Sequence, residues 1–144
     1  MGRPAAVQGA AQRQYFPVSG IHPGDTTMDL SEAVKAHSEW KIKLRSAISS
    51  KSTLDAVTIG RDDCCPLGKW LHGESRARYG ELPSHATCVQ AHAEFHREAA
   101  NVAQVINQKD YARAEKMLEA NTAYSHASGG VVLAIGTLKR EAKL

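Results

Sequence analysis

The chain lacks the features that would direct it into a membrane. Its longest unbroken hydrophobic run, from Val131 to Ile135, is far shorter than the roughly 20 apolar residues that a membrane-spanning helix needs. The N-terminal residues also lack the apolar stretch of a secretory signal peptide. We therefore expect a cytoplasmic protein without membrane insertion.

Cysteine and net charge are also low. The sequence has three cysteines, an odd number, and two of them, Cys64 and Cys65, are adjacent. Such usage does not form a disulfide framework, and it fits a reducing compartment in which the thiols are free or bind a metal. A formal net charge of +3 gives little electrostatic attraction for nucleic acid, so we expect no nucleic-acid partner.

The composition is that of one soluble globular domain, with 42% hydrophobic and 23% charged residues in 144. Residues 1–27 are the exception, because proline and glycine cluster there and apolar periodicity is missing. Met28 opens the periodic part of the sequence. We expect a disordered leader over residues 1–27 and one helical domain over residues 28–144.

Apolar residues recur at helical spacing in three long stretches and no segment alternates convincingly like a strand. The stretches are 30–48, 84–106 and one that begins at Asp110 and continues to Leu138, interrupted at Gly129-Gly130. Pro66 favours the first position of a further short helix, which places Cys65 at its N-cap and its end near Gly73. The prediction is an all-α fold, an antiparallel four-helix-type bundle with an additional short helix that bears the cysteine.

Two histidines on the second long helix are the strongest functional signal. His92 and His96 are four residues apart, a spacing that brings two imidazoles together on one face of a helix. Cys65 and His37 can complete four metal ligands. Nitrogen and sulfur donors favour zinc over magnesium or calcium, although the ligand types alone also allow nickel, copper and iron.

Three short motifs make the chain similar to a known family. They are His37-x-x-Trp40, Cys65-x-Leu67-Gly68-x-Trp70 and His92-x-x-Phe95-His96. Together with the end of the chain they resemble the bacterial chemoreceptor zinc-binding domain, over roughly residues 28–144. The resemblance implies a four-helix-type bundle, often a homodimer, in which His37, Cys65, His92 and His96 bind zinc.

The resemblance also implies a function in signal transduction. Domains of this family are attached to chemoreceptors or diguanylate cyclases, and they sense zinc or, through the cysteine, oxidants such as hypochlorous acid. This chain has neither a long receptor coiled coil nor a cyclase domain, so its signalling partner is unknown. Zinc gain or oxidation of Cys65 would reposition the short helix and change a partner interface.

Three alternatives were weighed against this sensory function. A zinc hydrolase would use Glu94 as its base, but zincins place the glutamate next to the first histidine, whereas Glu94 is two residues from each. A di-iron bundle needs several inward carboxylates in Glu-x-x-His pairs, and no such set is present. A metal-free dimeric interaction module is the third. We expect a protein that is not an enzyme.

For the other cysteines, for His85 and for the aromatic residues, the main prediction is a structural role. Cys88 shares a stripe with His92 and is expected in the core, with His85 near it; a second metal patch is the alternative. Cys64 is expected to be incidental, or else a resolving thiol. Trp40, Trp70 and Phe95 are expected around the site, and the last helix is the predicted dimer contact.

Overall fold

The computed structural model describes residues 28–144, and helices account for 77% of them. The leader predicted for residues 1–27 lies outside the described residues. No strand occurs among residues 28–144, which confirms the all-α fold class. The helices are α2 (Leu30–Ser38), α3 (Trp40–Ser50), α4 (Ala56–Gly60), α5 (Pro66–His72), α6 (Glu74–Tyr79), α7 (Pro83–Asn107), α8 (Tyr111–Met117) and α9 (Ala123–Ala142).

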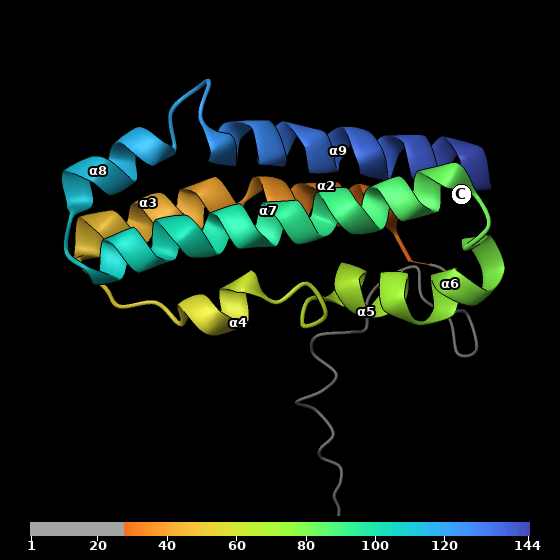
Figure 1. Cartoon of the computed structure of the whole chain (residues 1–144), viewed down its shortest axis with the longest axis horizontal. Coiled ribbons are helices and arrows are strands. Elements are labelled where there is room, and N and C mark those ends of the chain that lie inside the picture. Colours follow the sequence, from red (N-terminus) through yellow and green to blue (C-terminus); the bar gives the residue numbers. More distant parts are fainter. Residues whose placement is uncertain (1–27) are drawn as a thin grey trace, which may run out of the picture.

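The helices form four antiparallel rows (Figure 1). The first row is α2 followed by α3, and the second is made of the three short helices α4, α5 and α6, which run back along one side of the bundle. The third is the 25-residue α7, and the fourth is α9, joined to α7 through α8. Helix α7 packs against α3, α4, α5, α8 and α9, so it is the central element.

The predicted first helix is divided at Glu39 and extends two residues further, to Ser50. Asp29 caps it by accepting hydrogen bonds from the backbone N–H groups of Ser31 and Glu32. Glu39 keeps right-handed helical dihedral angles (φ −75°, ψ −11°), so the chain does not turn there. Figure 1 shows α2 and α3 end to end behind α7.

The predicted interruption of the last helix at Gly129-Gly130 is wrong. Helix α9 passes through both glycines, and the chain breaks instead between Met117 and Ala123. Asn121 adopts a positive φ of 63° in that break, and Thr122 caps α9 by accepting the N–H of Ser125. Helix α8 thus ends at Leu118, which has right-handed dihedral angles, and the left-handed Asn121 directly precedes the Thr122 cap that starts α9. Two glycines inside a helix only weaken helix propensity.

Periodicity alone also missed two short helices, α4 and α6. Both have only one buried position within the helix, Ile59 in α4 and Ser75 in α6, so no repeating apolar pattern marks them. The predicted short helix after Cys65 is confirmed as α5, with Cys65 at its N-cap and Gly73 at its C-cap. These three helices form the row that covers the metal centre.

Candidate metal centre

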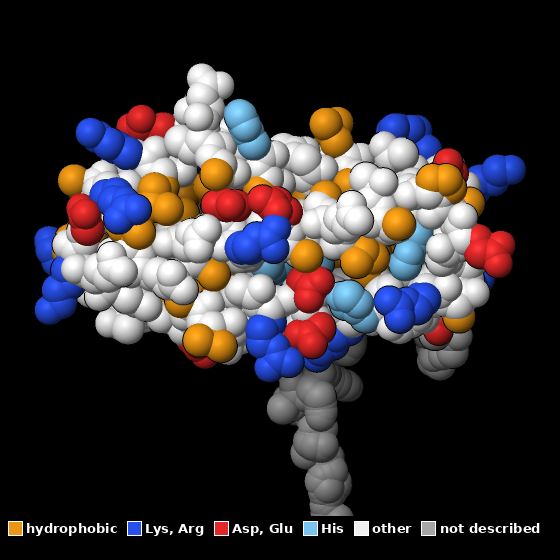
Figure 2. Space-filling view, viewed as in Figure 1, with side chains coloured by type: hydrophobic (Ala, Val, Ile, Leu, Met, Phe, Trp, Pro, Cys, Tyr) orange, Lys and Arg blue, Asp and Glu red, His pale blue; other side chains and the backbone are white. Residues whose placement is uncertain are grey.

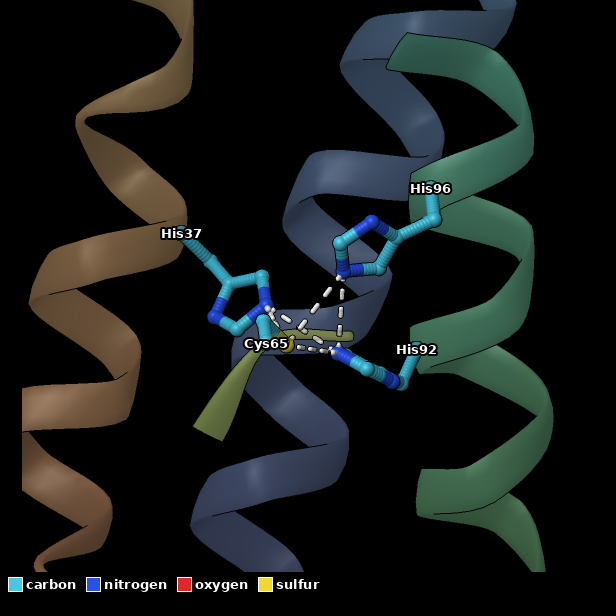
Figure 3. A group of neighbouring side chains, drawn as sticks. All are labelled: His37, Cys65, His92 and His96. Carbon is cyan, nitrogen blue, oxygen red and sulfur yellow. Dashed lines mark hydrogen bonds between the residues drawn. The ribbon is translucent and has the colours of Figure 1, made fainter. Parts of the chain in front are cut away.

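Four side chains from three separate parts of the chain meet in the middle of the bundle (Figure 3). His37 comes from α2, Cys65 from the N-cap of α5, and His92 and His96 from α7. Their four donor atoms all lie within 4.8 Å of one another. The three histidines are at most 4% exposed, and Cys65 is partly exposed.

Helix geometry positions the pair on α7. His92 and His96 are one turn apart, and their Nε2 atoms are 3.1 Å apart. The ring of Phe95 packs edge-on against His96 and His37, with centroids 5.6 and 5.3 Å apart. An aromatic wall beside the ligands excludes water from that side and restricts the imidazole rings.

Cys65 is positioned by the start of α5 and by a very close backbone contact. Its Sγ accepts the backbone N–H of Gly68 at 3.4 Å, which is the usual N-cap contact made by sulfur in place of oxygen. A Cβ atom on Gly68 would lie 1.8 Å from the backbone oxygen of Asp62. Only glycine at position 68 therefore allows the 61–65 turn to fold back onto α5.

Two carbonyl groups determine which nitrogen each imidazole presents to the centre. Nδ1 of His37 lies 2.7 Å from the Ala33 carbonyl oxygen, and Nδ1 of His96 lies 2.8 Å from that of Ile59. Because a carbonyl oxygen only accepts, each Nδ1 must bear the hydrogen, and each neutral ring keeps a lone pair on Nε2. Among residues 28–144, the buried Nδ1 of His92 has no hydrogen-bond partner.

The donor atoms fit a tetrahedral zinc ion. Zn–N bonds of about 2.05 Å and a Zn–S bond of about 2.3 Å require tetrahedron edges of about 3.3 Å between nitrogens and about 3.6 Å between sulfur and nitrogen. The Nε2 atom of His92 is 3.2 Å from that of His37 and 3.1 Å from that of His96. Cys65 Sγ lies 3.2, 3.6 and 3.9 Å from Nε2 of His92, His96 and His37. These five edges lie within about 0.4 Å of the zinc geometry. The sixth edge, between Nε2 of His37 and Nε2 of His96, lies within the 4.8 Å span of the four donor atoms.

Burial shifts the pKa values of His37, Cys65 and His92. It lowers the pKa of His92 to about 3, with smaller effects from His96 and His37, and it also lowers the pKa of His37. Burial raises the pKa of the Cys65 thiol by more than the N–H groups at the start of α5 lower it. The imidazoles of His37 and His92 are thus neutral at pH 7, while the helix N-terminus alone does not produce a thiolate at Cys65. A bound cation supplies the missing stabilisation.

Comparison with known families agrees with this geometry. Residues 37–103 match the model of the chemoreceptor zinc-binding domain, a segment that begins at the first of the four residues and includes the other three. The chain is therefore similar to this family over residues 37–103. No curated protein and no solved structure matches the chain.

The match and the donor set together indicate the coarse chemistry. The family is a zinc-binding, sensory one rather than a catalytic one, and the three-histidine, one-cysteine donor set of this chain suits zinc. Hard cations such as magnesium and calcium would need oxygen ligands, which the four residues do not offer. Among residues 28–144, every helix is too short or too polar to cross a bilayer.

The other sequence-predicted residues have mostly structural positions. Cys88 is fully buried in the core, as expected, and Cys64 is exposed. His85 forms no metal cluster in the described chain; its Nε2 lies 2.9 Å from the Ser75 hydroxyl. Glu94 pairs with Arg97 at the surface, where 46% of its side chain is exposed.

Sequence reasoning missed two contributors to the site. The aromatic prediction is confirmed for Phe95, whereas Trp70 packs against Tyr79 and the Trp40 ring lies under the Lys43 ammonium. Tyr124 of α9 packs behind Phe95, with centroids 5.8 Å apart. The carbonyl of Ile59 was the other omission, and no side-chain pattern could have revealed it, since a backbone group orients His96.

Proposed function

We propose that residues 28–144 form one regulatory domain in which His37, Cys65, His92 and His96 bind a single zinc ion. The observation that supports this assignment best is the convergence of four donor atoms from three distant segments within 4.8 Å. One cation would engage all four of these buried donor atoms at once, which hydrogen bonds among three rings and one thiol cannot do.

Zinc binding would join three helices that are otherwise linked only by packing. The ligands belong to α2, to the start of α5 and to α7, so the ion would connect the first, second and third rows of the bundle. Three neutral imidazoles and one thiolate leave the centre with a charge near +1 and fill all four tetrahedral positions. A filled coordination shell has no position for a reacting water, which favours sensing over hydrolysis.

Cys65 is the ligand through which an oxidant could act. Its partial exposure gives hypochlorous acid access to the sulfur. The thiolate would donate an electron pair to chlorine and hydroxide would leave; water would then displace chloride to give a sulfenic acid and a proton. Sulfur loses two electrons in these steps and chlorine gains them. A sulfenic acid is a poorer ligand than a thiolate, so the ion would be released.

The signal would then pass from the bundle to another protein. Loss of the ion would free the start of α5, in the middle of the second row, and a partner that contacts this row would detect the change. In line with the family, the partner we propose is a chemoreceptor or diguanylate cyclase of the cytoplasm, with the domain acting as a homodimer. A hydrolase is disfavoured because the Glu94 carboxylate pairs with Arg97 on the solvent side.

Metal content tests the proposal, with two adjacent cysteines as a matched pair. Protein purified without added metal is analysed by elemental mass spectrometry as the wild type, Cys65→Ser and Cys64→Ser. We expect one zinc per chain in the wild type and in Cys64→Ser, and strongly reduced zinc in Cys65→Ser. Stoichiometric hypochlorous acid should release the ion from the wild type and from Cys64→Ser. Absence of zinc in all three proteins would favour the metal-free dimeric interaction module.

A further inference from the structure

Helix α4 holds one of the proposed zinc ligands in position from outside the motif. The Ile59 carbonyl, at the end of α4, accepts the Nδ1–H of His96 at 2.8 Å. His37 differs, because the Ala33 carbonyl that it contacts is in its own helix. The orientation of His96 therefore depends on where α4 lies on α7.

A single side chain ties the start of α4 to α7. The Asn107 amide donates from Nδ2 to the Leu54 carbonyl at 2.8 Å and accepts the Leu54 N–H on Oδ1, also at 2.8 Å. Leu54 directly precedes Asp55, the N-cap of α4. This paired contact uses both hydrogen-bonding functions of the asparagine, and it determines the position and direction of the chain entering α4.

The other end of α4 approaches α7 where a glycine permits it. A Cβ atom on Gly60 would lie 3.1 Å from Cβ of Ala100, tighter than ordinary contact. At 100° per residue, Ala100 and Asn107 fall within about 40° of His96 around α7. Asn107, Ala100 and His96 thus share one face of α7, and α4 lies along that face.

We propose that Asn107 and Gly60 are positioning residues for the zinc centre, acting through the Ile59 carbonyl on His96. This inference rests on the proposed zinc ligation. Both residues lie outside the three ligand motifs. Groups that orient a metal-bound histidine typically change metal affinity by about 10-fold to 100-fold when they are lost.

The test measures zinc affinity by competition with a chelator in the full chain. Asn107→Ala should weaken binding by about 10-fold, and Asn107→Asp, which keeps the acceptor for the Leu54 N–H but not the donor, should give a smaller loss. Asp110→Ala is the matched control: it removes a capping contact to the Arg113 N–H near the same end of α7, so it should reduce stability yet leave zinc affinity within about twofold.

A double-mutant cycle tests the other end of α4. Gly60→Ala should weaken zinc binding several-fold, and Ala100→Gly should restore most of that affinity by returning the space. Cobalt substitution supplies a readout that a purely structural role would not alter, because the visible spectrum of Co²⁺ reports its ligand geometry. We expect the spectra of Asn107→Ala and Gly60→Ala to differ from that of the wild type, and that of Asp110→Ala to match it.

The outcomes separate this inference from the zinc assignment itself. Wild-type affinity and spectra in the Asn107 and Gly60 variants, together with loss of zinc in His96→Ala, would overturn the positioning role and leave the four-ligand site intact. Unchanged zinc binding in His96→Ala would overturn both. Equal losses in Asn107→Ala and Asp110→Ala would also overturn it, since general destabilisation would then explain the effect.

Discussion

The two sides of the metal centre are built in different ways. On one side, His92 and His96 project from the middle of a 25-residue helix, and their separation follows from helix geometry alone. On the other side, Cys65 sits at the edge of a seven-residue helix, at the end of an irregular turn. Its place depends on backbone contacts such as that between Gly68 and Asp62.

This difference shows where the centre is vulnerable. His92 and His96 move only if the long helix α7 moves. Cys65 belongs to the second row of the bundle, which consists of short helices joined by turns. Figure 2 shows the surface of that row bearing acidic and basic side chains close together near the lower edge of the view. Asp62, in the turn before α5, lies 3.0 Å from His72, so a polar contact supplements the burial of Leu67, Trp70 and Leu71 there. Substitutions in the second row should therefore disturb the metal centre more than substitutions elsewhere in the bundle.

The largest effect that we expect among substitutions outside the ligands is for Gly68→Ala. A Cβ atom cannot stay 1.8 Å from the Asp62 oxygen, so the turn must move and take Cys65 away from the three imidazoles. Such overpacking against backbone costs about 3 kcal/mol, and an equal loss of binding energy would be about 100-fold in zinc affinity. Chelator competition and thermal unfolding measure the two effects.

If Gly68→Ala keeps wild-type zinc affinity, the second row is not the vulnerable side of the metal centre. A control with the same chemical change is Gly129→Ala, in the middle of α9 and away from the second row. It should leave zinc affinity unchanged.

A medium effect is expected from His85→Gln, which tests how the second row is attached to α7. The Ser75 hydroxyl donates to the Trp70 carbonyl at 2.9 Å, so it accepts from Nε2–H of His85, which is 4% exposed and neutral. Loss of this contact should cost about 1 kcal/mol at pH 7.5.

The same substitution should change the pH dependence of stability. Burial, followed by the nearby Arg76 charge, lowers the pKa of His85. The unfolded chain then binds a proton at a pH where the folded chain does not, so wild-type stability decreases as pH falls through about 6.5. Denaturant unfolding of the metal-free proteins at pH 7.5 and 5.5 should show the advantage over His85→Gln shrinking at the lower pH. A constant difference would contradict the neutral buried histidine.

The smallest effect should come from Gly129→Ala, and its sign is opposite. Nothing lies within 4 Å of a Cβ atom built at Gly129, and the residue is helical. Alanine in a helix interior is favoured over glycine by about 0.5–1 kcal/mol, so thermal unfolding should shift upward by a few degrees. A lower midpoint would mean that the glycine has a packing role that the bundle contacts do not reveal.

Much of the fold could be predicted because the apolar periodicity of the sequence indicates its long helices. The stretches around Leu44, Phe95 and Leu138 repeat apolar residues at helical spacing, and each of these three residues is completely buried. Glu39 and the Gly129-Gly130 pair show the limit. Helix propensity is a weak local preference, and it does not by itself decide whether a helix continues through glycine or divides at a favourable residue.

Sequence alone determined which side chains could form the centre, because the spacing of His92 and His96 and the N-cap position of Cys65 before Pro66 are local properties of helices. Tertiary structure decided that His37 and Cys65 reach the same point, which nitrogen of His96 faces it and that α4 holds that ring in place. Those decisions depend on contacts between segments 27 to 55 residues apart, such as Cys65 with His92 and His92 with His37. Local spacing carries no information about such contacts, since they are set by how the rows of the bundle pack.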